Sequence, residues 1–507
     1  MTPQRFTRGP LLAALVAAAA ALPGLWFPFL SDDWVQIRSV ISGIPMRTPF
    51  DFFRPVYMAT LWWDHALWGL SPALFHATNL LLIAAAAALL TLAVQRLTGE
   101  AGLALGTGLL FAIHPFHVEN AAWVAARSDP LFTVFWLMAL LAYDRWRIRS
   151  WGLPILTLVL YELALAAKES AVTLPFVLIL LGYLSRRRPS AAEWRRGYLP
   201  LFMLSGAHML VLRTWVLSGP GRTLSENLGL GSPLNVMGMA AGGVLPLSIE
   251  RLSRRPALWG AAAIALVVCL LLLAWKRSGG IPRLALAAPA LFVVLATPSL
   301  VGFQERYLFL PSATAAIFLA ALIRSTGGRL AWTLAGLLAA GWIAGTASRW
   351  DGWREAATAS RRLVGDLAAL ADSPGVEEIV VADMPFRVRG GSVAGDFTAA
   401  LDLHGRRSTR IRALTYVSFP DAFADPLAGR GDASIVRAAS FAELRLVIPS
   451  EPFWRFVGPY PSAGVEREIA GLGSIRLEPD RALRLRIVTA QGRIACVWRR
   501  GRLERLF

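Results

Sequence analysis

Long apolar runs alternate with short polar junctions over residues 1–347. A bilayer core about 30 Å thick requires roughly 20 apolar residues in a helix, and somewhat fewer where the bilayer is thin. We therefore expect an all-α polytopic membrane domain over residues 1–347, with about eleven transmembrane helices. The predicted spans lie near residues 11–30, 72–94, 101–117, 131–146, 152–167, 171–184, 198–217, 257–275, 284–303, 307–323 and 330–347.

Two segments of this part leave alternatives open. The first run follows Arg5 and Arg8 and could be a cleaved signal peptide. We favour an uncleaved first helix, because the run continues to Leu30 and many further spans follow it. Residues 233–250 either cross the membrane or lie in its interface. Crossing gives about twelve helices and a cytoplasmic C-terminus, whereas an interfacial position gives eleven helices and an extracytoplasmic C-terminus.

The pattern changes after residue 348. Residues 349–372 predict an amphipathic helix rich in arginine and alanine. Short strand-like runs follow, separated by glycine, proline and aspartate. These runs are EEIVVADMPF, TYVSF, LRLVIP, SIRLEP, LRLRIV and IACVW. We expect residues 348–507 to form a small soluble domain of α+β or β-rich class, on the extracytoplasmic side.

Composition supports a membrane protein and argues against several other classes. The chain is 55% hydrophobic and 17% charged, which excludes an ordinary soluble enzyme. Its net charge of +18 does not indicate a nucleic-acid partner, because the arginines cluster beside apolar runs, as at 145–149 and 186–188. The positive-inside rule explains that pattern. Cys269 and Cys496 are too far apart in sequence to indicate a disulfide framework or a zinc motif.

Ionisable residues gather at the ends of the apolar runs. Charged side chains at membrane depth are costly, so they usually line a polar, functional cavity. The clusters are Asp32–Asp33, the group from His114 to Asp129, Lys168–Glu169 and Glu305–Arg306. Arginine-rich junctions predict a cytoplasmic location for 5–8, 145–149 and 186–196, which puts the first three clusters on the extracytoplasmic face. The eleven-helix arrangement adds the fourth cluster to that face, and we prefer it for this reason.

Several motifs together resemble those of one family. FAIHPFHVENAAWVAARSDPLFTVFWLMALLAY, residues 111–143, resembles a conserved stretch of GT-C superfamily glycosyltransferases. The similarity is to bacterial relatives of the transmembrane tetratricopeptide-repeat O-mannosyltransferases. The supporting segments occur in the family's order and cover most of residues 30–320. They are SDDWVQI (31–37), FRPVYMATLWWDHALWGLSPALFHATNLLL (53–82), AAKESAVTLPFVLIL (166–180) and QERYLFLPSA (304–313).

The resemblance implies a function. Members of this superfamily transfer a sugar from a polyprenyl-phosphate donor to an acceptor outside the cytoplasm. It implies an inverting transferase in a bacterial inner membrane, whose active site faces the extracytoplasmic side. The implied partners are the polyprenyl-phosphate sugar, membrane lipid and an extracytoplasmic hydroxyl acceptor on a protein, glycan or lipid. The tail lacks the 34-residue period of tetratricopeptide repeats, so the resemblance does not identify the acceptor.

The transfer chemistry that the resemblance implies needs only a few charged groups. An acceptor hydroxyl needs a general base, for which Asp33 is the first candidate and Asp32 the second. Both lie in the acidic loop that corresponds to the family motif; the alternative is a solvated loop that ends the first helix. The departing phosphate needs cations. The candidates for this role are Lys168, Arg306, Arg127 and Arg54, although arginines at such positions also occur as residues that extend to the membrane interface.

The remaining ionisable residues are expected to shape the pocket or to hold the acceptor. They are His114, His117, Glu119, Glu169, Asp129 and Glu305. Glu169 is expected to pair with Lys168 or Arg127, because an isolated buried charge is costly. His-x-x-His with a nearby acid can bind zinc or manganese, so a divalent metal ion remains open as a cofactor. We prefer hydrogen bonding among these residues and assign no metal ligand.

Two other classes of function remain as alternatives. A flippase or transporter for a lipid-linked sugar would use the same charges to line a pathway, but a transporter site tends to lie near the membrane midplane. A catalytically inactive envelope scaffold would not need the loop acids, and both are present. Neither a P-loop nor a glycine-rich dinucleotide turn occurs in the sequence, so a nucleotide donor is not expected.

Overall fold

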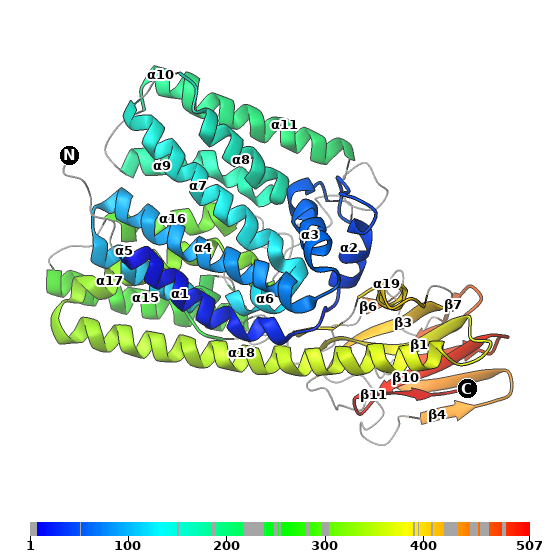
Figure 1. Cartoon of the computed structure of the whole chain (residues 1–507). Helices are drawn as coiled ribbons and strands as arrows, with labels where there is room; N and C mark the ends of the chain where they lie inside the picture. Colours follow the sequence, from blue (N-terminus) through cyan, green and yellow to red (C-terminus); the bar gives the residue numbers. More distant parts are fainter. Residues whose placement is uncertain are drawn as a thin grey trace. The chain divides into compact units, whose positions relative to one another are not determined.

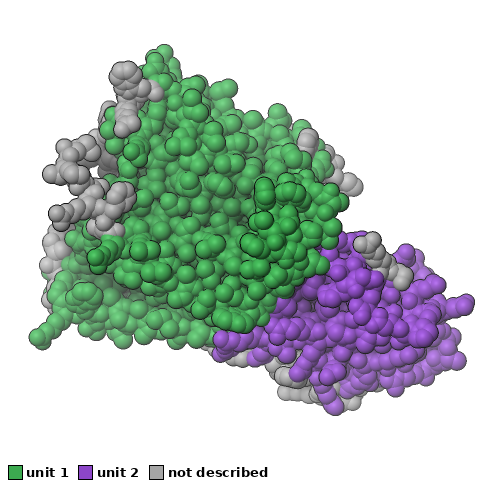
Figure 2. Space-filling view, viewed as in Figure 1, with its two compact units in different colours: residues 1–27, 39–350 green, residues 28–38, 351–507 purple. Residues whose placement is uncertain are grey.

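The chain divides into two compact units, which Figure 2 colours separately. The first unit comprises Met1–Phe27 and Ser39–Trp350, and the second comprises Pro28–Arg38 and Asp351–Phe507. The computed structural model describes residues 8–50, 52–149, 152–184, 189–215, 238, 240–247, 252, 255–278, 283–296, 304–388, 391–393, 395–406, 409–419, 434–446, 455–456, 466–478 and 483–507.

The first unit is a bundle of helices (Figure 1). Helix α1 packs against α4 and α5, α7 packs against α8, and α17 packs against α16 and α5. Helix α18 (Gly328–Ala371) begins in this unit and continues into the second. The other helices of the first unit are α1 (Gly9–Ala21), α3 (Pro55–Trp68), α4 (Pro72–Thr98), α5 (Ala101–Ala112), α6 (His117–Ala122), α7 (Ser128–Arg149), α8 (Ile155–Ala167), α9 (Leu174–Leu184), α10 (Ala191–Glu193), α11 (Leu199–Trp215), α15 (Pro256–Ser278), α16 (Arg283–Ala296) and α17 (Pro311–Thr326).

Each of the eleven predicted apolar runs overlaps a helix in the part of the chain that the structure describes. Among the residues that the structure describes, four helical stretches are long and apolar enough to cross a membrane, namely Gly9–Trp26, Pro72–Thr98, Val124–Ile148 and Gly328–Ala371. The shorter apolar helices are Ala101–Ala112, Ile155–Ala167, Glu169–Tyr183, Ala257–Leu273, Ala287–Ala296 and Pro311–Thr326. The described residues thus have the helices of a multi-pass membrane protein, and the count of eleven spans stays a prediction. Half of residues 233–250 lie outside the described residues, so the alternatives for this segment stay open.

Short 3₁₀ turns interrupt the bundle at the charged clusters. These turns are Val124–Arg127, Glu169–Thr173 and Glu305–Leu308. Lys168 has an extended backbone (φ −162°, ψ 136°), so α8 ends before it. Helix ends leave backbone groups without intrahelical partners, and such sites favour polar side chains. The ionisable side chains therefore lie beyond the apolar helix ends, in the order that the sequence predicts.

Two β-sheets form most of the second unit (Figure 1). The first has the strand order β11-β10-β1-β3-β6 with β2 paired to β1, and the second has the order β4-β5-β9-β8-β7. Strands β10, β1 and β3 are parallel, whereas the second sheet is antiparallel. The strands are β1 (Glu378–Val388), β2 (Gly391–Ser392), β3 (Arg410–Phe419), β4 (Ser434–Arg437), β5 (Phe441–Leu446), β6 (Arg455–Phe456), β7 (Glu466–Ile469), β8 (Gly473–Leu477), β9 (Leu483–Val488), β10 (Arg493–Arg499) and β11 (Arg502–Arg505).

Burial differs between the two sheets as their strand directions predict. Residues 379–385 of β1 are all buried, as in a central parallel strand covered on both faces. Strand β9 alternates buried and exposed residues, as in an antiparallel sheet with one solvated face. Asp366 of α18 accepts the N–H of Leu503 in β11 (2.9 Å). Together with α19 (Phe397–Leu403), these elements confirm the strand-rich C-terminal region.

Candidate active site

The acidic loop that contains Asp32 and Asp33 belongs to the second unit. Leu30 donates its N–H to Oδ2 of Asp33 (2.8 Å), and Asp33 donates its own N–H to the carbonyl of Leu30 (2.9 Å). This turn leads into α2 (Asp33–Val40), whose N-terminal end favours a carboxylate. Asp33 is 1% exposed and Asp32 is partly buried. The turn therefore holds the Asp33 carboxylate in one orientation.

Lys168 and Asp129 form a buried ion pair in the first unit. Nζ of Lys168 lies 2.5 Å from Oδ1 of Asp129. The same ammonium lies 4.7 Å from the centre of the Tyr307 ring, within the range of a cation–π contact. Lys168 follows α8 and Asp129 lies in the first turn of α7, so packing of these helices brings the two predicted residues together.

Arg54 binds Glu169 through two parallel hydrogen bonds. Nε donates to Oε2 (2.9 Å) and Nη2 donates to Oε1 (2.5 Å), which is the strong bidentate geometry of an arginine–carboxylate pair. The guanidinium also covers the ring of Phe52 at 4.5 Å. The sequence predicted Lys168 or Arg127 as the partner of Glu169, and this prediction is wrong. Each of those cations already bonds to another carboxylate.

Arg306 contacts Glu119 mainly through its backbone. Its N–H donates to Oε2 of Glu119 (3.1 Å), whereas Nη1 lies 4.0 Å from Oε1, beyond hydrogen-bond distance. The guanidinium lies 4.5 Å from the ring centre of Trp123 and 5.4 Å from that of Tyr307. Aromatic faces thus hold the cation while its side chain is 17% exposed. Such a guanidinium can bind a phosphate without first breaking a short ion pair.

Tyr307 connects two of the predicted cations, Lys168 and Arg306. Its ring centre lies 4.7 Å from Nζ of Lys168 and 5.4 Å from the guanidinium of Arg306, and Lys168 is also paired with Asp129. Two of the four predicted phosphate ligands therefore lie against the same ring, and Arg54 is paired with Glu169, which directly follows Lys168 in the chain. The sequence analysis did not single out Tyr307, although its place beside Arg306 in the QERY motif was a usable signal.

Arg127 makes a dense set of bonds inside the first unit. It is fully buried, its Nη2 lies 2.5 Å from Oδ2 of Asp64, and Nε donates to Oδ1 of Asn79 (2.7 Å). Nη2 also donates to the carbonyl of Phe75 (2.8 Å), and Nη1 lies 3.4 Å from the hydroxyl of Thr60. These partners come from α3 and α4, so Arg127 ties its own turn to both helices.

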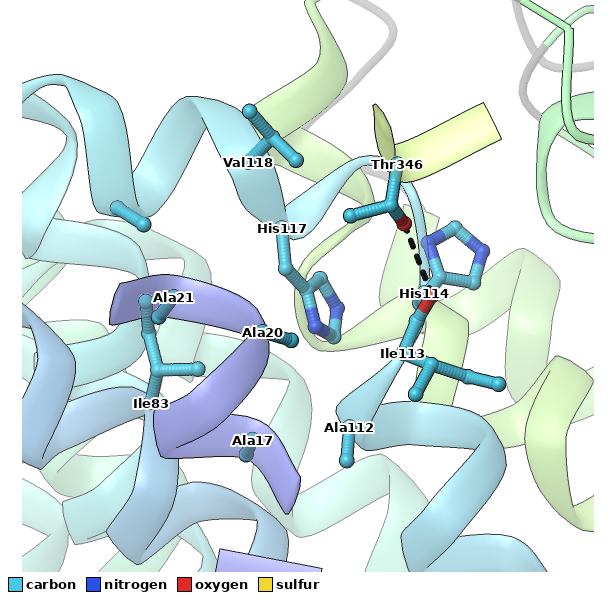
Figure 3. Close-up of a pocket in the computed structure, with 11 residues that line it drawn as sticks. Ala17, Ala20, Ala21, Ile83, Ala112, Ile113, His114, His117, Val118 and Thr346 are labelled. Carbon is cyan, nitrogen blue, oxygen red and sulfur yellow. Dashed lines mark hydrogen bonds between the residues drawn. The ribbon is translucent and has the colours of Figure 1, made fainter. Parts of the chain in front are cut away.

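A cavity of about 10 Å³ lies beside His114 and His117 (Figure 3). Alanines of α1 and α5 form much of its wall. A cavity of this volume has room for about one water and not for a sugar. Nε2 of His117 lies 2.9 Å from the hydroxyl of Ser312, and Nδ1 of His114 accepts the N–H of Phe116 (3.3 Å). Both rings therefore have partners within the protein.

Glu305 forms its ion pair with Arg349, a residue that the sequence analysis did not single out. Nε of Arg349 lies 3.1 Å from each carboxylate oxygen, and Nη2 donates to the carbonyl of Leu247 (2.5 Å). Among the residues that the structure describes, no three histidine, cysteine, aspartate or glutamate side chains are placed to hold a metal ion.

Most predicted site residues of the first unit thus meet another predicted site residue. The pairs are Lys168 with Asp129, Arg54 with Glu169 and Arg306 with Glu119. Arg127 and Glu305 instead pair with Asp64 and Arg349. Asp32 and Asp33 belong to the other unit, and a single site shared by all clusters stays a prediction.

Comparison with known proteins gives partial matches to one group. The chain is 33% identical over 142 residues to Protein O-mannosyl-transferase Tmtc1 of Drosophila melanogaster, which covers 28% of this chain and 16% of the relative. It is 32% identical over 124 residues to Protein O-mannosyl-transferase TMTC1 of Homo sapiens, covering 24% of this chain and 13% of that protein. The chain thus spans about one sixth or less of the length of these relatives.

Other comparisons add less. No family model matches the chain. The crystal structure of ArnT from Cupriavidus metallidurans bound to undecaprenyl phosphate aligns with 85% of this chain and 95% of that chain, at 14% identity and a TM-score of 0.36. We draw nothing from a likeness at that score. The partial sequence matches confirm that the chain resembles the transmembrane O-mannosyl-transferases, as its motifs predicted.

Proposed function

We propose that the protein is a multi-pass glycosyltransferase of a bacterial inner membrane. It transfers a monosaccharide from a polyprenyl-phosphate carrier to an extracytoplasmic hydroxyl group on a protein, glycan or lipid. The activity for which the partial relatives are named, O-mannosyl transfer, supports glycosyl transfer. The observation that carries the proposal is that Lys168 and Arg306 share the ring of Tyr307, while Arg54 pairs with Glu169, the neighbour of Lys168 in the chain.

The proposed reaction needs one base and a set of cations. The acceptor oxygen attacks the anomeric carbon from the face opposite the phosphate. A new carbon–oxygen bond forms while the bond from that carbon to the phosphate oxygen breaks, which inverts the configuration. The acceptor proton passes to Asp33, with Asp32 as an orienting acid, and the electron pair of the broken bond leaves on polyprenyl phosphate.

The three gathered cations suit the departing phosphate. Each has a carboxylate partner, so the empty site is close to neutral: Asp129, Glu169 and Glu119 oppose Lys168, Arg54 and Arg306. Arg306 has the longest ion-pair distance and is the first phosphate ligand in this account. Negative charge that develops on the phosphate then meets preoriented donors, which is the usual source of a large electrostatic contribution to catalysis.

The other predicted residues take supporting roles in the proposal. Arg127 has so many internal partners that phosphate binding would break them, so we assign it to holding α3 and α4 together. His114 and His117 support the helix junctions through Phe116 and Ser312. Glu119 orients the turn that carries Arg306, and Glu305 anchors the same turn to α18 through Arg349.

The acidic loop and the C-terminal domain belong to one compact unit. The two segments must therefore lie on the same side of the membrane. Because arginine-rich junctions predict a cytoplasmic location for residues 5–8, the loop after the first span is extracytoplasmic. This supports an extracytoplasmic C-terminal domain and an active site on that face.

Sugar transfer in isolated membranes tests the proposal. A panel of labelled polyprenyl-phosphate sugars is offered to wild type, to Asp33→Asn and to the acid-to-amide control Glu100→Gln, which alters an exposed ion pair with Arg324. The proposal expects transfer by wild type and by the control, and none by Asp33→Asn. Full transfer by Asp33→Asn would remove the assigned base. If wild type moves the lipid-linked sugar across the membrane without transferring it, a flippase is favoured. If wild type shows neither activity, a scaffold is favoured.

A further inference from the structure

The loop that carries Asp33 contains a backbone conformation that its own sequence does not favour. Ser31 has φ of 51°, in the left-handed region where residues with a side chain are uncommon. Its side chain is nearly buried, and its hydroxyl accepts a hydrogen bond from the hydroxyl of Ser392 (3.0 Å). Strained residues of this kind persist where the surrounding structure enforces them, and they are common at functional sites.

Gly395 is the second residue of the C-terminal domain that contacts this turn. A Cβ atom built on Gly395 would overlap with the carbonyl group and Cα of Ser31. Only glycine can therefore bring this backbone so close to the strained residue. Ser392 ends β2 and Gly395 precedes α19, so a short segment of the C-terminal domain covers the turn from one side.

Helix α2, which begins at Asp33, is held by the same segment. Nε of Arg38 lies 2.5 Å from Oδ2 of Asp402, and the rings of Trp34 and His404 lie 5.7 Å apart. Asp402 lies in α19 and His404 directly follows it. Residues 392–404, which we name the clamp, therefore contact the chain on both sides of Asp33. The contacts are to Ser31 before it and to Trp34 and Arg38 after it.

We propose that the clamp positions the Asp33 carboxylate for the transfer reaction. Asp33 takes its orientation from the turn at Leu30, and the strained Ser31 lies inside that turn. Since the clamp contacts Ser31 directly, it sets the geometry of the base without touching the substrate. Ser392, Gly395 and Asp402 are thus positioning residues. This inference rests on the proposed function of Asp33 and gives the C-terminal domain a part in catalysis.

A charge exchange gives the sharpest test. Arg38→Asp and Asp402→Arg each break the pair, and the double variant restores it in reverse. The side chain of Arg38 is 47% exposed, so this pair contributes little to folding. We expect each single variant to lower kcat by about tenfold with unchanged KM for the donor, because small displacements of a catalytic group are costly. The double variant should recover most of the loss.

Two further variants complete the series. Gly395→Val should lower kcat more than Ser392→Ala, since it displaces the backbone of Ser31. Ser440→Ala is the matched control, because Ser440 is exposed in the turn between β4 and β5. Full turnover in Gly395→Val and in both charge variants would overturn the inference, as would a loss that the double exchange does not recover.

Hydrogen exchange separates this inference from the proposed function. Amides of residues 30–38 should exchange faster in Asp402→Arg than in wild type, whether or not a donor sugar has been found. If they exchange at the wild-type rate, the clamp does not hold the loop. Suppose that wild type transfers sugar, that Asp33→Asn does not, and that the clamp variants keep the full kcat. The proposed function then stands, and only the positioning role of the clamp fails.

Discussion

The ammonium of Lys168 lies 2.5 Å from Oδ1 of Asp129, and each of these side chains is 4% exposed. Burying two charges is favourable only when the partners satisfy one another, so each depends on the other. The pair also lies against Tyr307, which contacts Arg306. A polar group thus persists among apolar helices, which is the situation expected of a functional site in a membrane protein.

Replacing Lys168 alone should damage folding as well as function. Lys168→Met leaves Asp129 buried without a partner, which costs on the order of 3–5 kcal/mol. The double variant Lys168→Met with Asp129→Asn removes both charges and should recover most of the folded protein, measured by size-exclusion chromatography in detergent. We expect the double variant to remain inactive, because the phosphate has lost a cation. Wild-type transfer by the double variant would exclude Lys168 as a donor ligand.

Arg306 and Arg127 should respond differently to the same change. Arg306→Gln removes a cation that is 17% exposed and has no short ion pair, so we expect near-normal amounts of protein and a donor KM raised by about tenfold or more. Arg127→Gln leaves Asp64 buried and unpaired, so the amount of folded protein should fall sharply. The two measurements are donor titration and protein yield. The reverse pattern would exchange the assigned roles of these arginines.

The side of the C-terminal domain can be measured with an impermeant maleimide. Cys496 is fully buried, and burial raises the pKa of its thiol to about 12, so it should not react in the folded protein. In a Cys269→Ser background, Ser440→Cys should label in cells whose outer membrane has been permeabilised.

The matched control for that labelling is Ala191→Cys, in the junction that the arginines predict to be cytoplasmic. It should label only after lysis. If Ser440→Cys also requires lysis, the C-terminal domain is cytoplasmic, and the acidic loop in the same unit is cytoplasmic with it.

The helices could be predicted from local sequence because apolar runs of this length have few stable alternatives in a bilayer. The partners of the charged side chains could not be predicted in this way. Lys168 and Asp129 are 39 positions apart, and Arg54 and Glu169 are 115 apart, so only tertiary packing decides which carboxylate meets which cation. The contact of Ser31 with Ser392 joins residues 361 positions apart. No local pattern indicates that the acidic loop packs with the C-terminal domain.

Helix α18 illustrates a second limit. Hydropathy changes near residue 348, so the sequence predicted one span before that point and a separate amphipathic helix after it. The structure contains one helix of 44 residues, Gly328–Ala371. Residues near the change, such as Arg349, Trp350 and Asp351, are compatible with a helix, and no proline interrupts it. The sequence becomes more polar where the surroundings of the helix change. The backbone hydrogen bonds of the helix continue through that point.

The antiparallel sheet should lose stability in acid through Glu478. Hydrogen bonds from Arg445 and Arg484 hold the pKa of its carboxyl below the usual value. The unfolded carboxyl titrates near ~4.3, so this stabilisation is complete above that pH and is lost as the pH falls through the lower pKa of the folded state. Amides of β5 and β9 should be less protected from exchange in Glu478→Gln than in wild type at pH 7.

At pH 3 the two proteins should differ less than at pH 7, because a smaller fraction of the wild-type carboxyl is charged. Comparing variant and wild type at each pH cancels the intrinsic dependence of exchange on pH. A difference that is the same at pH 7 and pH 3 would exclude the charge of Glu478 as its cause.

The central claim is that phosphate binding and proton removal belong to different residues of one enzyme. Binding of polyprenyl phosphate and transfer of its sugar should therefore be measured on the same preparations of wild type, Asp33→Asn and Arg306→Gln. The account predicts that Asp33→Asn binds polyprenyl phosphate with the wild-type Kd but transfers no sugar, whereas Arg306→Gln binds it at least about tenfold more weakly. Transfer by Asp33→Asn at the wild-type rate, together with unchanged binding by Arg306→Gln, would contradict it.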